Sequence, residues 1–154
     1  MRVVTLIENH TDNELACEHG LSFYVEYNEK SYLLDAGQSG LFIDNARKLG
    51  IDLSYVEKAV LSHAHYDHAG GFADFVKENS HAKVYMQKTS AEQCFSEKAD
   101  GMKDIGIPED VRSALEQRLV YADGDLKLDE GVHLIAHHAK GLAERGKQMR
   151  MYRE

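Results

Sequence analysis

The stretch Ser62-His63-Ala64-His65-Tyr66-Asp67-His68-Ala69-Gly70-Gly71 decides the fold of this chain. Three histidines and one aspartate fall within six residues of it, after the apolar run 59–61 and before the helix-like segment 72–76. Imidazole and carboxylate groups are common ligands of transition metals. Four such groups at the end of a buried strand, followed by a Gly-Gly break, indicate a metal site. A solvated loop that is merely rich in histidine is the weaker interpretation.

The spacing within this stretch predicts two neighbouring metal positions. Side chains at positions i and i+2 of an extended segment point to the same side, so His63 and His65 can share one cation. Asp67 and His68 come after a turn and face an adjacent position. Two cations about 3.5–4 Å apart can bind a bridging hydroxide and clamp a phosphoryl or acyl oxygen.

The bulk composition narrows the class of protein. A length of 154 residues predicts one domain spanning residues 1–154, and a net charge of −8 argues against a nucleic-acid-binding surface. The first apolar run is too short for a signal peptide, and no stretch approaches the ~20 apolar residues of a membrane span. Cys17 and Cys94 lack the paired spacing of a disulfide framework, which favours free thiols and a cytoplasmic location.

Strands and helices alternate along the sequence. We expect strands at residues 2–7, 21–27, 31–34, 58–62, 83–86, 119–121, 126–128 and 132–135. We expect helices at residues 41–49, at 72–78 and after Pro108, and a mixture of helix and loop at 88–106. This order predicts an α/β or α+β sandwich with a mixed sheet.

Two earlier residues could reach the metal stretch. Asp35 ends a strand and is followed by Gly37 and Gly40, so the backbone there approaches another group closely. An ordinary turn cap is the alternative for Asp35. His19 stands beside Gly20 in the loop before the predicted hairpin. Contact with a substrate and an ordinary loop position are both open for His19.

The motif His63-x-His65-x-Asp67-His68, with its glycines after a strand, resembles the signature of the metallo-β-lactamase-fold superfamily of metal-dependent hydrolases. The segments 18–22, 35–39 and 49–52 further resemble one branch, the dihydropterin–ribofuranosylaminobenzene 5′-phosphate synthase-like proteins. Ala36 departs from that branch, in which threonine is usual at this position.

The resemblance implies an αββα sandwich with a two-metal site. By this resemblance His63 and His65 bind the first metal, and Asp67 and His68 bind the second. Asp67 also acts in catalysis by orienting the hydroxide, and Asp35 orients a ligand or a loop. The metal is expected to be zinc, with iron or manganese as alternatives, because diiron members usually carry glutamate where this chain has His65.

The resemblance also implies ligands from a second half that the sequence through Glu154 does not supply. The chain is therefore interpreted as the first αβ half of the fold plus an insertion. His137 and His138 are weak substitutes, because adjacent residues on a strand point to opposite faces. In the resembling proteins His19 would contact substrate rather than metal.

Two functional hypotheses follow. The first is a hydrolase that uses a metal-bound hydroxide on an ester, amide or phosphoester of a small molecule. The second is a truncated, catalytically incompetent metal-binding half-domain that needs a partner copy or a missing C-terminal half. Half of a sandwich leaves an apolar sheet face exposed, so this hypothesis predicts a homo-oligomer through that face. Neither hypothesis involves nucleic acid or a membrane.

Overall fold

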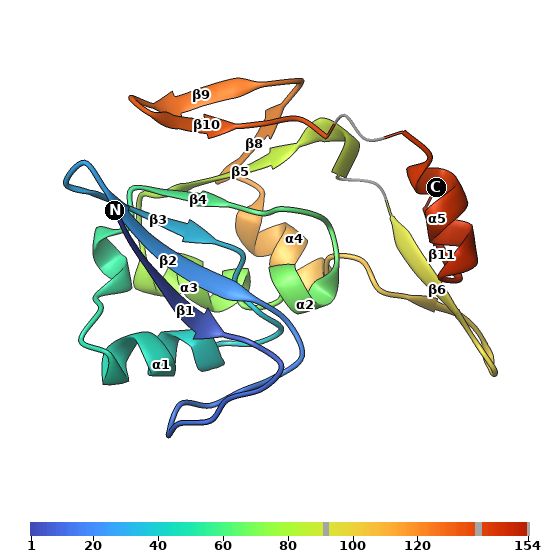
Figure 1. The fold of residues 1–154 in the computed structure, drawn as a ribbon, viewed down its shortest axis with the longest axis horizontal. Coiled ribbons are helices and arrows are strands. Elements are labelled where there is room, and N and C mark those ends of the chain that lie inside the picture. Colours follow the sequence, from blue (N-terminus) through green and yellow to red (C-terminus); the bar gives the residue numbers. More distant parts are fainter. Residues whose placement is uncertain (91–92, 138–139, 154) are drawn as a thin grey trace.

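A mixed six-stranded sheet organises the chain (Figure 1). The computed structural model describes residues 1–90, 93–137 and 140–153. The strands lie in the order β1-β2-β3-β4-β5-β8. Their bounds are β1 (Arg2–Ile7), β2 (Ser22–Tyr27), β3 (Lys30–Leu34), β4 (Lys58–Val60), β5 (Lys83–Gln87) and β8 (Leu119–Ala122). The first three strands are antiparallel and β3, β4, β5 and β8 are parallel, which confirms the predicted mixed sheet.

Local sequence explains how these strands connect. Asn28 and Glu29 both have positive φ, 48° and 62°, and close the β2–β3 hairpin with a two-residue turn whose twist suits antiparallel strands. The parallel pairs need crossovers, which run through α1 (Leu41–Lys48), α3 (Phe72–Glu78) and α4 (Glu109–Leu115). As a result, the carboxyl ends of β3 and β4 meet at one edge of the sheet.

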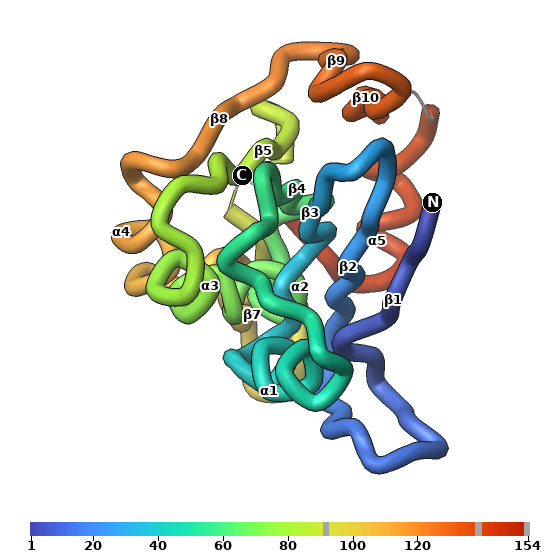
Figure 2. Tube along the Cα trace, turned by 90° about the vertical axis from the view of Figure 1, so that its left-hand side faces the viewer, coloured from blue at the N-terminus to red at the C-terminus, as the bar shows by residue number. Residues whose placement is uncertain are grey.

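One face of the sheet carries the core. A cross-strand row on this face packs in one buried cluster with Phe42 of α1 and Phe75 of α3. The row consists of Tyr24, Leu33, Ala59, Val84 and Leu119. Helices α1, α3 and α4 lie together beside the sheet (Figures 1 and 2). The amphipathic helices predicted from the spacing of apolar residues therefore cover this side.

The alternate residues of the same strands form a second row, which we call the open face. Each of its members is only partly buried. The row consists of Phe23, Leu34, Val60, Tyr85 and Val120, one residue from each strand from β2 to β8. An apolar row of this kind, partly exposed across five strands, is unusual for a sheet with a complete second layer.

The hairpin of β9 (Leu126–Asp129) and β10 (Val132–Leu134) is attached to the sheet through Asp129. Lys30 and Lys58 each donate from Nζ to this carboxylate at 2.6 Å, and the Tyr32 hydroxyl donates at 3.1 Å. The hydrogen bonds from Lys30 and then Lys58 lower the pKa of Asp129 to about 2. Burial, followed by the hydrogen bond to Asp129, raises the pKa of Tyr32 to about 12.

This attachment predicts an acid-sensitive stability. The folded-state pKa of Asp129 lies below the unfolded value, so its contribution is fully present above about pH 4 and is lost as the pH falls towards 2. The difference in free energy of unfolding between the wild type and Asp129→Asn should therefore shrink across this window in urea titrations. Asp123→Asn is the matched control, because the Asp123 side chain is 86% exposed. A difference that stays constant from pH 6 to pH 2 would contradict the assignment.

Residues 88–106 correct one expectation. The mixture of helix and loop predicted there is wrong in its main part, because β6 (Cys94–Lys98) and β7 (Gly101–Asp104) form a hairpin. Gly101 has a φ of +122°, and β7 is exposed throughout, so no apolar alternation marked the strand. The remaining elements are 3₁₀ turns at Leu53–Tyr55 and Lys88–Ser90, α2 (Tyr66–Ala69), α5 (Leu142–Gln148) and β11 (Met151–Arg153), which pairs with β6.

Within residues 1–90, 93–137 and 140–153, no helix is long and apolar enough to cross a bilayer.

Candidate metal centre

The candidate centre begins where β3 and β4 end. Asp35 follows β3, and its amide donates to the Val60 carbonyl at 2.9 Å, which extends the parallel pairing by one step. Asp35 is 1% exposed and has a φ of +56°, a left-handed conformation that is rare for a residue other than glycine. This backbone turn holds the carboxylate beneath the residues that follow β4.

The Asp35 carboxylate receives three hydrogen bonds. Its Oδ1 accepts from the Ser62 amide at 2.7 Å, and its Oδ2 accepts from Ser62 Oγ at 2.7 Å. The same Oδ2 lies 2.7 Å from His68 Nδ1. A carboxylate only accepts, so His68 Nδ1 carries the proton and a neutral His68 presents its Nε2 lone pair on the other side of the ring.

Ser62 links the Asp35 carboxylate to His63 and thereby determines which nitrogen of His63 carries the proton. Ser62 Oγ gives its single proton to Asp35, so at 2.9 Å from His63 Nδ1 it can only accept. His63 therefore also carries its proton on Nδ1 and presents Nε2 as a lone pair. One carboxylate thus sets the tautomer of two imidazoles, as supporting carboxylates do around metal-binding histidines.

The three imidazoles of the motif lie together. The ring centroid of His63 is 4.5 Å from that of His65 and 4.2 Å from that of His68. His65 directly precedes the single turn of α2, which carries Asp67 and His68. Asp67 Oδ2 is 3.7 Å from His68 Nε2. The structure thus brings all four predicted ligands into one cluster. The ring of His63 is close to that of His65, its predicted partner, and to that of His68, which the sequence assigned to the second metal.

Burial and mutual repulsion act on these imidazoles. Burial, followed by the charges of His68 and His65, lowers the pKa of His63 to about 4. Burial also lowers the pKa of His65. Burial alone would lower the pKa of His68, but the hydrogen bond and charge of Asp35 outweigh it and raise the pKa.

Glycines allow the cluster to pack tightly. Gly70 and Gly71, expected to form a break, instead have helical dihedral angles. A Cβ on Gly70 would lie 2.1 Å from the Gln38 carbonyl oxygen, and one on Gly71 would lie 2.1 Å from that of Ala36. Glycine is therefore required at these two positions because the backbone lies close to the loop after β3, and not because the chain reverses direction there.

The loop between β1 and β2 also reaches the cluster. Glu18 accepts hydrogen bonds from the amides of Gln38 and Ser39 at 3.0 and 2.9 Å, which ties this loop to the one after Asp35. His19 Nδ1 is 2.8 Å from Asn9 Oδ1, and its Nε2 is 3.3 Å from Asp67 Oδ2. His19, expected at a substrate mouth, thus lies against a predicted metal ligand.

Sequence reasoning missed three residues that organise this region: Asn9, Glu18 and Ser62. Glu18 and Ser62 stood inside motifs already quoted, so their position was a usable signal. Asn9 carried none, because its partner lies ten residues away across an irregular loop.

The donor set suits a divalent metal in chemistry and in its supporting contacts. The coordination site is incomplete, because within the described residues no three His, Cys, Asp or Glu side chains are grouped so as to hold one ion. His137 is exposed after β10, and His138 lies outside the described residues. The residues present therefore fit part of a ligand set.

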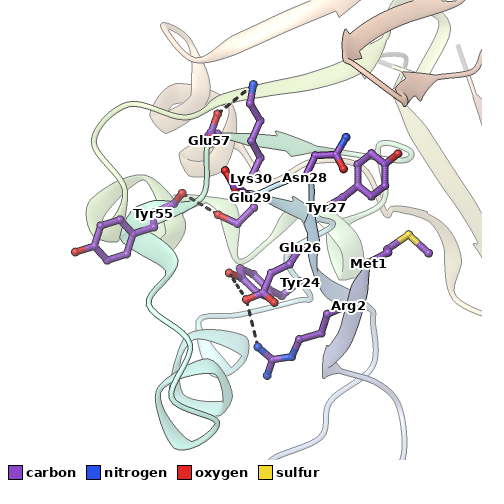
Figure 3. A pocket seen from close by; sticks show the side chains of 11 residues that line it. Met1, Arg2, Tyr24, Glu26, Tyr27, Asn28, Glu29, Lys30, Tyr55 and Glu57 are labelled. Carbon is purple, nitrogen blue, oxygen red and sulfur yellow. Dashed lines mark hydrogen bonds and ion pairs between the residues drawn. The ribbon is translucent and has the colours of Figure 1, made fainter.

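A large hollow lies elsewhere. It measures about 660 Å³ and surrounds the β2–β3 turn, at the opposite end of β3 from Asp35 (Figure 3). Four of its charged side chains form two ion pairs, Arg2 with Glu26 at 3.2 Å and Lys30 with Glu57 at 3.6 Å, and Glu29 also lines it. Among the described residues its lining contains no histidine, so the cluster after β4 remains the active-site candidate.

Comparison with known proteins agrees with this fold and motif. The family model of the metallo-beta-lactamase superfamily matches residues 15–143, and the chain belongs to this superfamily. Its members bind divalent metals. The chain is 30% identical over 131 residues to the uncharacterized protein MJ0448 of Methanocaldococcus jannaschii, a match that covers 82% of this chain and 49% of that protein.

Solved structures share the fold of this chain. Tm1679, described as a metal-dependent hydrolase of the beta-lactamase superfamily, superposes with a TM-score of 0.74 at 25% identity and covers 99% of this chain and 53% of its own. A quorum-quenching N-acyl homoserine lactone hydrolase shares the fold, with a TM-score of 0.56 at 20% identity over 75% of this chain and 50% of its own. This chain thus spans about half the length of the relatives it matches.

Proposed function

We propose that this chain carries the ligand-bearing part of a metal-dependent hydrolase that acts on an ester, amide or phosphoester of a small molecule. One observation carries the proposal: Asp35 fixes the proton of His68 on Nδ1 directly and that of His63 through Ser62, which leaves the Nε2 atoms of both imidazoles without a proton. Membership of the superfamily and the likeness to Tm1679 support it.

The roles of the residues follow the motif. His63 and His65 would hold one metal ion, and Asp67 and His68 would hold a second. Zinc is our first choice because imidazole and carboxylate ligands suit it, although such sites also accept iron and manganese. A bound divalent metal would supply Lewis-acid activation and water that ionises near neutral pH.

The chain's own groups would then position the reactants. Asp67 would orient the attacking hydroxide through its carboxylate, whose Oδ2 lies 3.7 Å from His68 Nε2. Asp35 would keep His68 from rotating away. The branch resemblance at segments 18–22, 35–39 and 49–52 favours a pterin-linked or phosphate-bearing substrate. The lack of paired cysteine spacing favours a cytoplasmic enzyme.

A chelation experiment tests this function. Treatment with EDTA should abolish turnover of a generic phosphodiester or ester such as bis-p-nitrophenyl phosphate, and added Zn²⁺ or Mn²⁺ should restore it. His63→Ala should lower the restored rate at least about 100-fold, because it removes a ligand and disturbs its neighbours. His81→Ala is the matched control, since His81 is exposed. Turnover that survives both chelation and His63→Ala would refute the proposal.

A second candidate has its own observation in support. The open face and the unfinished ligand group favour a half-domain that binds metal weakly and associates with a second copy. Metal content and light-scattering mass of the same sample separate the two candidates. A monomer with two tightly held ions favours the competent hydrolase, and a dimer with one ion or none favours the half-domain.

A further inference from the structure

Ser22, the first residue of β2, carries a hydroxyl that is completely buried beside the turn after β3. Its side chain is 0% exposed, and its Oγ donates a hydrogen bond to the main-chain carbonyl of Asp35 at 2.8 Å. The preceding carbonyl, that of Leu21, accepts from the Gly37 amide at 3.0 Å. Serine is mostly found exposed, and a buried hydroxyl needs a partner. The start of β2 is therefore joined to the turn by one side-chain and one main-chain hydrogen bond.

The peptide unit between Asp35 and Ala36 is held from two elements. Its carbonyl accepts from Ser22 Oγ of β2, and its amide donates to the His68 carbonyl of α2 at 2.8 Å. On the other side of the Asp35 Cα, the amide of Asp35 donates to the Val60 carbonyl at 2.9 Å. Both peptide units that flank this Cα are thus fixed by groups from other parts of the chain.

These contacts matter because the conformation of Asp35 is unfavourable. Its φ of +56° brings the Cβ of an L-residue close to its own backbone, and such a residue persists only where its surroundings impose it. The backbone angles also set the direction of the Cβ, and so the direction in which the carboxylate reaches Ser62 and His68 at 2.7 Å. Without the Ser22 hydroxyl, the peptide unit keeps one of its two hydrogen bonds and can rotate towards an ordinary conformation.

We propose that Ser22 is a positioning residue for the metal centre. By holding the main chain of Asp35 in its left-handed conformation, the Ser22 hydroxyl aims the carboxylate that orients His63 and His68. This inference rests on the proposed metal site and extends its support to β2. Ser22 acts through Asp35, so its effect depends on the carboxylate being present.

The tautomers of the imidazoles report this role in the metal-free full chain. Long-range ¹H–¹⁵N NMR spectra, recorded above the pKa values of the imidazoles, should show the wild-type His63 and His68 with their protons on Nδ1. In Ser22→Ala, His68 should populate both tautomers, and its Nδ1 proton should exchange faster with water. Ser22→Cys, whose thiol is a weak donor, should give an intermediate mixture and replaces Ser22→Ala if that variant does not fold.

Ser31→Ala is the matched control for these spectra. Ser31 is also a buried strand serine, 8% exposed, and its Oγ donates to the Tyr55 carbonyl at 2.8 Å near the opposite end of β3 from Asp35. Its loss removes the same kind of hydrogen bond, so the two alanine variants should lower the urea midpoint by similar amounts. Only Ser22→Ala should alter the tautomers, which a merely structural role would leave unchanged.

Titration with Co²⁺, followed by its visible d–d absorption and by calorimetry, measures the consequence for the centre. Ser22→Ala should weaken Co²⁺ binding about 10-fold and alter the absorption band, whereas Ser31→Ala should bind Co²⁺ as the wild type does. In an Asp35→Asn background, Ser22→Ala should cause no further loss of affinity, because the carboxylate that it aims is absent.

The outcomes separate this inference from the proposed function. Wild-type tautomers or wild-type Co²⁺ affinity in Ser22→Ala would overturn the inference, as would an equal loss of affinity in Ser31→Ala or an undiminished loss in the Asp35→Asn background. A wild-type chain that binds no Co²⁺ would instead refute the proposed metal site. The NMR comparison of Ser22→Ala with Ser31→Ala would then decide by itself whether Ser22 orients Asp35 and its imidazoles.

Discussion

Replacing Gly71 with alanine is expected to abolish the native packing at the start of α3 and to destabilise the chain by at least about 3 kcal/mol, the upper range for overpacking. The added Cβ would lie 2.1 Å from the Ala36 carbonyl oxygen, 2.5 Å from that of Ser39 and 2.8 Å from the ring of Phe42. Two of these neighbours are backbone atoms of the loop that carries Asp35, so neither can move without disturbing the centre. Urea unfolding followed by circular dichroism measures the loss.

Comparison with Gly50→Ala separates the cost of steric overlap from the cost of backbone strain. Gly50 has a φ of +70°, but nothing lies within 4 Å of the position of its Cβ. Gly50→Ala should therefore cost only the backbone strain, about 1 kcal/mol. Gly71 has an ordinary helical conformation, so its cost comes from contact alone. Unfolding of the two variants at the same urea concentration would contradict a close approach of Gly71, at the start of α3, to the loop after β3.

The second large effect is expected at Asp35. Asp35→Ala would leave the Ser62 amide and the Nδ1 proton of His68 without their acceptor, in a site where Asp35 itself is 1% exposed. Each buried donor that is left without an acceptor costs about 1–3 kcal/mol. The same change frees both His63 and His68 from their fixed tautomers, so Co²⁺ affinity should fall about 10–100-fold.

Asp35→Asn should separate the loss of stability from the loss of Co²⁺ affinity. The amide has nearly the same shape, and its oxygen can still accept from the Ser62 amide. Its NH₂ group donates and cannot accept from His68 Nδ1, so the imidazole should lose its orientation while the fold survives. We therefore expect Asp35→Asn to unfold near the wild type and to bind Co²⁺ almost as poorly as Asp35→Ala. Wild-type affinity in Asp35→Asn would show that His68 is oriented by other groups.

Much of the architecture was readable from local patterns. The spacing of Phe72, Phe75 and Val76 placed α3 within its observed bounds, and the turn at Asn28 placed the β2–β3 hairpin. These elements depend on neighbours in sequence, for which periodicity and turn chemistry are direct signals. The four candidate metal ligands were recognisable for the same reason, because they lie within six residues of the sequence.

The contacts that organise the cluster could not be read in the same way. Asp35 reaches Ser62 and His68 only because β3 and β4 are parallel neighbours, and Asn9 meets His19 across an irregular loop. The β6–β7 hairpin was missed because β7 has no buried residue to produce an alternating pattern. In each case the decisive partner is distant or the strand is polar, so local propensity carried no information.

The parallel pairing of β3 with β4 also bears on the order of folding. The β2–β3 hairpin closes over a two-residue turn and can form early, whereas β4 pairs only after the intervening helix has been placed. Until that late step, Asp35 and the imidazoles of the motif are unconnected, and a metal present during refolding can capture His63, His65 and His68 in the wrong combination. Metal added after refolding should therefore give a more homogeneous protein than metal present throughout.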